Sequence, residues 1–289
     1  MSDRTKGIFS ILASAFGFAL MAVFVRWCDD FGGPVSSFQK SFFRNLVALV
    51  IAATVFVRVR RAAVPPREPV SGRAMAVILL RSVLGTVGIF ANFYALSHIP
   101  IAEGQTLNKT APFFTVLFAG IFLGERPGWR QCGVLALAFL GVTMIVKPGF
   151  AGAAAFPLAM GLLGGLCAGG AYACVRRLGL WQVEGTLIIL VFSAFSCLAS
   201  VPFMLHRLDP MTFAQVLALL GAGAGAAIGQ FGITAAYRFA APSSIAVYDY
   251  SNIVFTAVFG YLLFGQRPDL WSVGGMLLVI AAAVLMRRG

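Results

Sequence analysis

The stretch "FFTVLFAGIFLGERPGW" at residues 113–129 decides the fold, because a closely similar stretch occurs later in the same chain. Residues 254–271 read "VFTAVFGYLLFGQRPDLW", and the two stretches align at an offset of 141 positions. The matched pairs are Phe114 with Phe255, Thr115 with Thr256, Phe118 with Phe259, Gly124 with Gly265, Arg126 with Arg267 and Pro127 with Pro268. Each stretch is an apolar run that stops at Gly-x-Arg-Pro. The repetition indicates two related halves.

Composition places both halves in a membrane. Of the 289 residues, 60% are hydrophobic and 11% are charged, and the mean hydropathy is +0.90. A soluble domain has about 25% charged residues, so this chain cannot cover a water-facing surface. A net charge of +12 would suggest nucleic acid as a partner of a soluble protein. Here the excess is assigned to loops, so the predicted partners are the lipid bilayer and a small-molecule substrate, with no nucleic acid.

Ten apolar segments are long enough to cross a bilayer, which needs about 20 residues per helix. The first has a charged front and lacks a small-residue cleavage site, so it is interpreted as a spanning helix and not as a removed signal peptide. We therefore expect an all-α integral membrane protein of ten transmembrane helices. The predicted spans are 7–27, 38–58, 74–97, 101–123, 129–146, 156–176, 184–205, 212–238, 243–264 and 269–286.

The loop charges predict the orientation of these helices. With the N-terminus in the cytoplasm, fourteen Lys and Arg residues fall inside and four outside. Cytoplasmic loops carry such an excess, so both termini are expected in the cytoplasm, in a multi-pass protein of the inner membrane. All four tryptophans fall at predicted helix ends or in short loops, where amphipathic rings favour the membrane interface.

The repeat divides the ten helices into two sets of five, residues 1–149 and 150–289. The "VR" that ends the first helix, at 25–26, recurs at 175–176 at the end of the sixth. Five is an odd number of crossings, so the second set enters the membrane from the opposite side. Such inverted repeats are typical of transporters, because exchanging the conformations of the two halves exchanges access between the two sides.

Ten helices in a 5+5 arrangement, with the fourth and ninth ending in "GERP" and "GQRP", resemble the drug/metabolite transporter superfamily, EamA-type branch. The resemblance covers essentially the whole chain. It implies a helical bundle with a cavity between helices 1–4 and 6–9, and with helices 5 and 10 at the periphery. It also implies secondary transport of a small metabolite, more often export (efflux) than import, without naming the substrate.

The charges predicted to lie within the membrane, away from the interfaces, are few, namely Arg44, Arg81, Glu103, Lys109 and Asp249. A charge at the bilayer centre costs at least about 2.5–3.5 kcal/mol, so it is tolerated where it faces a cavity or a partner. Alternatives that involve no substrate stay open. Arg81 can extend to the interface, Arg44 can pair with Glu103 or Asp249, and Glu103 can be an interfacial carboxylate.

Uncharged polar residues extend this set. The predicted hydrogen-bonding groups are Asn92, Gln105, Asn108, Tyr248 and Asn252. The fourth and ninth helices each have a polar first half and an apolar second half, and Asp249 aligns with Asn108 at the same offset of 141. We expect these polar halves to face a solvated cavity and not lipid.

Other motifs receive simpler interpretations. Gly161, Gly165 and Gly169, and likewise Gly221, Gly225 and Gly229, have the four-residue spacing of close helix packing. The same faces would also serve a homodimer, so the oligomeric state stays open. The cysteines lack metal or redox spacing, the two histidines stand alone, and no nucleotide-binding motif is present. No metal, cofactor or enzymatic activity is therefore predicted.

The sequence thus predicts a secondary active exporter that works by alternating access. Arg44, Lys109 and Arg81 would attract an anionic group of the substrate, and Asp249 or Glu103 would balance them and carry a coupling proton. An amino acid or an amino-acid derivative, such as an opine-type metallophore, fits this charge. The alternatives are an importer or exchanger of a vitamin, nucleoside or drug-like compound, and, from another class, a membrane-embedded enzyme.

Overall fold

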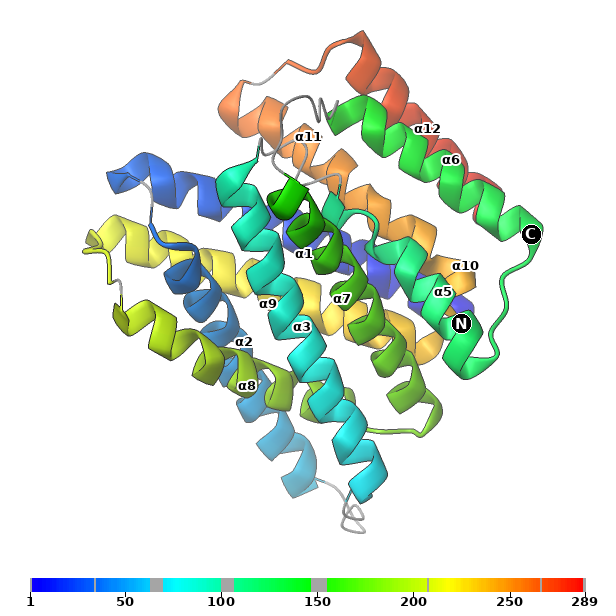
Figure 1. Ribbon diagram of the computed structural model, residues 1–289, viewed down its shortest axis with the longest axis horizontal. Coiled ribbons are helices and arrows are strands. Elements are labelled where there is room, and N and C mark those ends of the chain that lie inside the picture. The colour runs from blue at the N-terminus through cyan, green and yellow to red at the C-terminus, as the bar shows by residue number, and fades with distance from the viewer. Residues whose placement is uncertain are drawn as a thin grey trace.

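The computed structural model describes residues 2–33, 35–62, 70–99, 107–146, 155–206, 208–265 and 267–287. Within these ranges the regular elements are all helices, and they form one bundle (Figure 1). Eight of them are long and apolar enough to cross a membrane, and α5 and α12 are shorter apolar helices. The prediction of an all-α protein with ten apolar helices is confirmed.

The helix bounds follow the predicted spans closely. They are α1 Asp3–Gly32, α2 Ser37–Ala62, α3 Gly72–His98, α5 Ala111–Leu123, α6 Trp129–Val146, α7 Ala155–Leu180, α8 Gly185–His206, α9 Phe213–Phe239 and α12 Leu270–Arg287. The ninth span consists of three pieces, α10 Pro242–Ile245, the 3₁₀-helix η1 Ala246–Tyr250 and α11 Ser251–Phe264. Side-chain caps begin several of these helices; for example, Thr212 and Gln215 form a reciprocal capping box at α9.

The repeated Gly-x-Arg-Pro motif ends a helix in both halves. Gly124 follows α5 with φ 73°, and Gly265 follows α11 with φ 64°. Glycine adopts this left-handed conformation without the steric cost that a Cβ would add, which makes it the common residue directly after a helix. The proline three residues later cannot continue a helix. The motif therefore has a structural role at two matching helix ends.

The small-residue faces pack helices closely, as predicted. A Cβ on Gly225 would lie 2.8 Å from the backbone nitrogen of Met21, so α9 meets α1 backbone to backbone. On α7, Gly169 faces Thr115 of α5 in the same way. The fifth and tenth helices, α6 and α12, pack against each other along one side of the bundle (Figure 1), where a Cβ on Gly275 would lie 2.5 Å from the Gly141 carbonyl oxygen.

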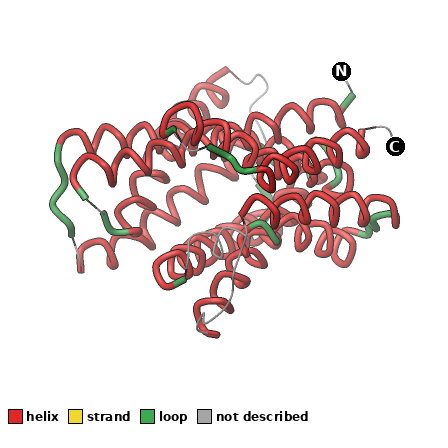
Figure 2. Tube along the Cα trace, turned by 90° about the horizontal axis from the view of Figure 1, so that it is seen from above, coloured by secondary structure: helices red, strands yellow, loops and turns green. Residues whose placement is uncertain are grey.

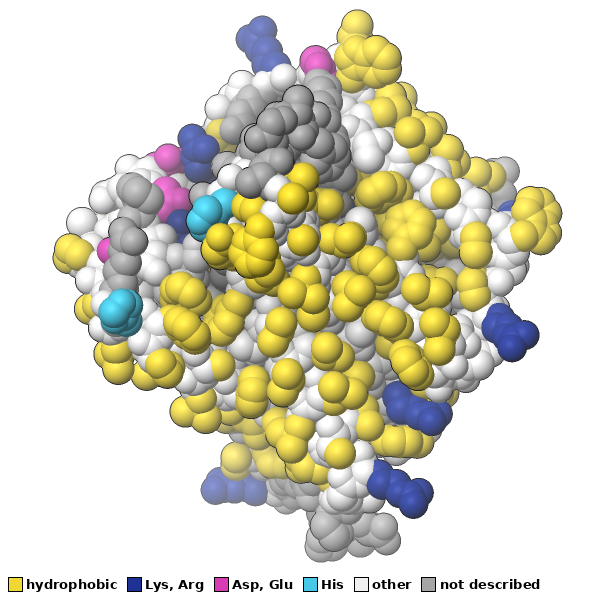
Figure 3. Space-filling view, in the orientation of Figure 1, with side chains coloured by type: hydrophobic (Ala, Val, Ile, Leu, Met, Phe, Trp, Pro, Cys, Tyr) yellow, Lys and Arg dark blue, Asp and Glu magenta, His cyan; other side chains and the backbone are white. Residues whose placement is uncertain are grey.

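The outer surface is suited to lipid. Figure 3 shows hydrophobic side chains spread over the middle of the molecule, with Lys and Arg side chains mostly along its edges. Leu198, Phe203 and Leu262 expose 73%, 50% and 67% of their surfaces, which a soluble protein would bury. The tryptophans at helix starts are exposed as well, Trp129 at 89% and Trp271 at 67%. The chain is a multi-pass membrane protein.

Both chain ends lie at the same end of the bundle. Figure 2 shows the two termini close together, and the Arg4 guanidinium donates a hydrogen bond to the carbonyl of Met286. We call this end the terminal face. It carries the starts of α1, α3, α6, α8 and α10 and the ends of α2, α5, α7, α9 and α12. The other end is the opposite face.

Candidate functional site

Two interrupted helices position the central polar residues. In the first half, Leu107 and Asn108 are helical, Lys109 and Thr110 form a turn, and α5 begins at Ala111. In the second half, η1 separates α10 from α11 at the matching place, since Asn108 aligns with Asp249. The spans had been predicted as continuous helices. Interrupted backbone at membrane depth is tolerated where it is packed in protein or lines a cavity.

The turn at Lys109 joins the two halves. Lys109 Nζ donates a hydrogen bond of 2.9 Å to Asn252 Oδ1, and Asn252 Nδ2 donates one of 3.0 Å to the Ala15 carbonyl oxygen. All three residues lie deep in the bundle. The chain of hydrogen bonds therefore connects the interrupted helix of the first half, α11 of the second half and α1.

Asp249 lies beside this chain of hydrogen bonds without joining it. The Asp249 carboxylate and the Lys109 ammonium interact electrostatically. Among the described residues, no side chain forms an ion pair within 4 Å or a hydrogen bond with that carboxylate. Asp249 is half-buried as a residue. The structure thus places a carboxylate at membrane depth beside the Lys109 ammonium.

Arg81 on α3 is buried and only 2% exposed. It lies nine residues after the helix start, or about 14 Å along the axis at 1.5 Å per residue. Its Cζ stands 3.6 Å from the centroid of the Phe192 ring, and Gly85 leaves room for it because a Cβ there would lie 2.8 Å from Nη1. Within the described chain, Nε and Nη1 have no hydrogen-bond partner. Arg81 does not extend to the interface in this structure.

Arg44 on α2 approaches the same region. Its guanidinium carbon lies 5.7 Å from the centroid of the Phe18 ring, and it interacts electrostatically with Arg81. No described carboxylate lies within 4 Å of either arginine, so Arg44 does not pair with Asp249 in this structure. Neither arginine thus has a counter-ion among the described residues.

The other residues that the sequence predicts for the site lie at different depths in the bundle and are buried to different extents. Asn92 packs against Gly164 of α7, eleven residues beyond Arg81 on α3 and therefore about 16 Å away along the axis. Its Oδ1 is buried without a hydrogen-bond partner among the described atoms. Asn108 is half-buried and Tyr248 is buried. Glu103 and Gln105 lie outside the described residues, so their predicted roles stay predictions.

The sequence reasoning missed two tyrosines of the bundle interior. Tyr172 on α7 and Tyr237 on α9 have ring centroids 5.3 Å apart. Tyr172 interacts electrostatically with Arg44, Arg81 and Asp249. One signal could have found it: Tyr172 continues the helical face of Gly165 and Gly169 at the next i+3 position, so a polar ring extends a small-residue stripe.

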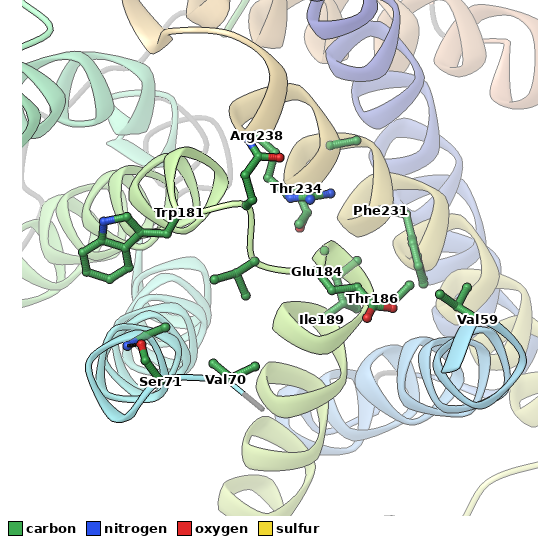
Figure 4. A pocket seen from close by; sticks show the side chains of 15 residues that line it. Val59, Val70, Ser71, Trp181, Glu184, Thr186, Ile189, Phe231, Thr234 and Arg238 are labelled. Atoms are coloured by element: carbon green, nitrogen blue, oxygen red, sulfur yellow. Dashed lines mark hydrogen bonds between the residues drawn. The ribbon is translucent and has the colours of Figure 1, made fainter. Parts of the chain in front are cut away.

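A cavity of about 820 Å³ opens at the terminal face. Figure 4 shows its walls, which come from the end of α2, the start of α3, the α7–α8 connection and the end of α9. The polar and aromatic lining residues include Ser71, Trp181, Glu184, Thr186 and Arg238.

An apolar layer separates the cavity from Arg81. Ala74 of α3 and Ile189 of α8 line the cavity, and the next residues inward on these two helices are Ile78 and Phe192, exposed 0% and 2%. Arg81 follows Ile78 by one helical turn. No cluster of three potential metal ligands occurs in the part of the chain that is described.

A family model covers both halves of the chain. The EamA-like transporter family matches residues 5–147 and again residues 155–288. The chain belongs to the EamA-like transporter family. Membership makes it a transporter of a small molecule across a membrane and not an enzyme.

Named relatives of this EamA-like transporter differ in what they carry. It is 28% identical to the pseudopaline exporter CntI of Pseudomonas aeruginosa, over 98% of this chain and 96% of the relative. It is 24% identical to a riboflavin transporter of Brucella anthropi, over 96% and 97%. Human solute carrier family 35 member G1 is 26% identical, over 96% and 78%. A solved crystal structure shares the fold, with a TM-score of 0.83 at 14% identity over 98% and 97% of the two chains.

Proposed function

We propose that this EamA-like transporter is a secondary exporter of a small anionic or zwitterionic metabolite. The observation that carries the proposal is Arg81, which is 2% exposed and lacks an anionic partner among the described residues. A buried charge without a partner is strongly unfavourable, so its presence favours an anion supplied by the substrate. Arg44, which interacts electrostatically with Arg81, and Lys109 are two further cations at membrane depth.

Alternating access of two inverted halves, residues 1–149 and 150–289, is the proposed mechanism. Its support is the interruption of two helices at matching positions, because interrupted helices at mid-membrane supply the binding site in many transporters with inverted repeats. Asp249, at one interruption, would carry a coupling proton in exchange for substrate. Glu103 is the alternative carrier.

Export from the cytoplasm is the proposed direction, across the inner membrane of a cell. The excess of basic residues supports a cytoplasmic terminal face. The cavity of about 820 Å³ opens at that face, where an exporter would load its substrate. The relative named as a pseudopaline exporter supports both this direction and an opine-type amino-acid derivative as the substrate class.

A second candidate is transport of a vitamin. The relatives named as riboflavin transporters support it, at 24–26% identity over nearly the whole chain. A neutral, flat ligand would rely on the aromatic side chains of the centre and would have little need of Arg81. The charge of the substrate therefore separates the two candidates.

The test is an untargeted comparison of metabolites in cells and medium, between a strain lacking the protein and one overproducing it. Export predicts an acidic or zwitterionic compound that accumulates inside the deletion strain and in the medium of the overproducer. A compound that is depleted inside the deletion strain and left in its medium would mean import and would overturn the proposed direction.

Proton coupling has its own test. Asp249→Asn keeps the size of the side chain and removes its titratable proton. We expect this variant, at unchanged expression, to lose transport driven by a pH gradient while retaining exchange of substrate across the membrane. Unchanged gradient-driven flux would contradict a proton-carrying role for Asp249.

A further inference from the structure

The cavity at the terminal face ends before it reaches Arg81. Its lining residues farthest along the two helices from that face are Ala74 of α3 and Ile189 of α8 (Figure 4). Arg81 lies seven residues beyond Ala74, or about 10 Å along the helix axis. The next residues inward, Ile78 and Phe192, are 0% and 2% exposed. A compound in the cavity is therefore close to Arg81 but separated from it by buried apolar side chains.

The Arg81 guanidinium is directed inward, away from the terminal face. A Cβ on Gly85, four residues farther along α3, would lie 2.8 Å from Nη1. Long helical side chains usually lean back over the preceding turn, whereas Arg81 lies towards the following one. Its Nε and Nη1 atoms are shielded from solvent and have no hydrogen-bond partner among the described atoms. A substrate anion therefore reaches them only after a neighbouring side chain moves.

Phe192 is the side chain that contacts the guanidinium directly. The centroid of its ring lies 3.6 Å from Arg81 Cζ, so the ring covers one face of the cation. The same ring lies against Gly85, where a Cβ would be 2.8 Å from the Phe192 Cε2 atom. Along α8, Phe192 follows the cavity-lining Ile189 by one helical turn. The ring thus contacts the cation one turn inward from the cavity wall.

This contact covers the cation without using the atoms that bind an anion. A carboxylate binds a guanidinium through N–H groups in its plane, whereas an aromatic ring binds its face. Phe192 can therefore make the same contact before and after a substrate has bound at Arg81. Rotation of one side chain opens the path, and the cation–π contact closes it again.

We propose that Phe192 is an inner gate, whose ring closes the path from the cavity to Arg81 and admits an anionic substrate when it turns away. The inference rests on the proposed role of Arg81 in binding an anion. Phe192 is then a positioning residue that acts through Arg81. The gate divides the path on the terminal side into an outer compartment, the cavity, and an inner one that contains the guanidinium.

Cysteine labelling of the purified full-length protein tests this gate. In a background with the five native cysteines replaced by serine, Thr186→Cys reports the cavity and Ile78→Cys reports the layer beneath it. The reagents are two small methanethiosulfonates, one with an anionic sulfonate and one with a cationic trimethylammonium group. We expect both to label Thr186→Cys rapidly and Ile78→Cys slowly, because Ile78 lies behind the closed ring.

Removal of the ring should expose the inner compartment. Phe192→Ala should accelerate labelling of Ile78→Cys by the anionic reagent about tenfold or more, since a desolvated cation–π contact no longer holds the path closed. The cationic reagent should gain less, because the charge of Arg81 repels it. Arg81→Gln in the same protein should remove this difference between the reagents, which loosened packing alone would not produce.

Two further variants guard against loss of the fold. Phe192→Leu fills most of the space of the ring without its cation–π contact, so it should give a smaller gain and keeps the test valid if Phe192→Ala unfolds. The matched control is Leu198→Ala, on the same helix but 73% exposed on the outer surface. It should leave the labelling of Ile78→Cys unchanged.

Three results would overturn the gate. They are labelling of Ile78→Cys as fast as that of Thr186→Cys while Phe192 is present, slow labelling that persists in both Phe192 variants, and equal gains for the two reagents. These results would leave the proposed export of an anion standing, because the comparison of metabolites tests it on the unmodified chain. A neutral compound in that comparison would instead refute the proposed substrate class, and with it an anion as the compound that the gate admits, whatever the labelling shows.

Discussion

The ion pair between Glu125 and Arg176 should stabilise the contact between the two halves of this transporter at the terminal face. Arg176 Nε lies 2.7 Å from Glu125 Oε1, and the two side chains are only 12% and 18% exposed. Glu125 follows α5 of the first half and Arg176 lies near the end of α7 of the second. Arg176 also donates to the carbonyl of Arg238, at 3.4 Å. The pair thus joins three elements.

The sequence repeat supplies an internal control. Arg26 aligns with Arg176 through the shared "VR", and it lies near the opposite face. Its partner is Asp30, four residues later on the same helix, at 3.2 Å, with exposures of 61% and 45%. This pair connects nothing across the two halves. Both aligned arginines therefore form an ion pair with a carboxylate. The pair of Arg176 joins the two halves and is mostly buried, whereas the pair of Arg26 lies within one helix and is exposed.

The expected energies follow from burial. Removing one partner of a fully buried pair costs about 3–5 kcal/mol, whereas exposed pairs contribute about 0–1 kcal/mol. For Glu125→Gln, which removes the charge from a mostly buried pair, we expect a loss of about 2 kcal/mol between these limits. For Asp30→Asn we expect less than about 0.5 kcal/mol. A loss of 2 kcal/mol lowers the ratio of folded to unfolded protein roughly thirtyfold.

Two measurements check this expectation. Thermal unfolding of the purified protein should shift by about 5 °C for Glu125→Gln and by about 1 °C or less for Asp30→Asn. In a Cys132→Ser background, the half-buried Cys174 of α7 reports loosening of the contact between the halves, and its alkylation should be faster in Glu125→Gln. Arg176→Gln combined with Glu125→Gln should cost little more than either alone. Equal effects of the Glu125 and Asp30 substitutions would refute the reasoning.

Three glycine substitutions and one control, Gly133→Ala, test helix packing, the position of Arg81 and a helix end. Gly275→Ala should destabilise the protein by about 1–3 kcal/mol, because its Cβ would lie 2.5 Å from a backbone oxygen of α6; Gly133→Ala, with open space around it, should not destabilise it, and thermal unfolding compares the two. Gly85→Ala should displace the Arg81 guanidinium, so substrate affinity should fall about tenfold with little change in unfolding temperature; unchanged affinity would contradict the role of Arg81. Gly124→Ala should cost about 1–2 kcal/mol in unfolding free energy, because its φ of 73° strains any residue with a Cβ.

The architecture could be predicted almost completely because lipid restricts it so strongly. A spanning segment must be a long apolar helix, so hydropathy alone locates it. The span predicted at 129–146 coincides with α6, and the Gly-x-Arg-Pro motif coincides with two helix ends. The interruptions before α5 and α11 were not predicted, because the polar composition of those stretches is equally compatible with a continuous helix facing a cavity.

The site was harder to predict for a different reason. Helical spacing shows which residues share a face of one helix, but it does not show which neighbour that face meets. Arg81 and Asn92 share a face of α3, yet Arg81 lies against Phe192 of α8 and Asn92 against Gly164 of α7. Tyr172 was missed because the small-residue face of α7 was interpreted as a packing face only, so the polar ring that extends it was not considered.

The two interruptions lie at matching positions of the repeat, but they carry different charged residues. Each half therefore makes a different contribution to the site. Lys109 lies at the first interruption, and the aligned residue at the second is Tyr250; Asp249 lies at the second, and the aligned residue at the first is Asn108. Each half thus brings one charge, of opposite sign, to the same region. On the proposed mechanism, a ligand that contacts both charges binds both halves at once. Its affinity must then change whenever the halves move relative to each other, which is the coupling that alternating access requires.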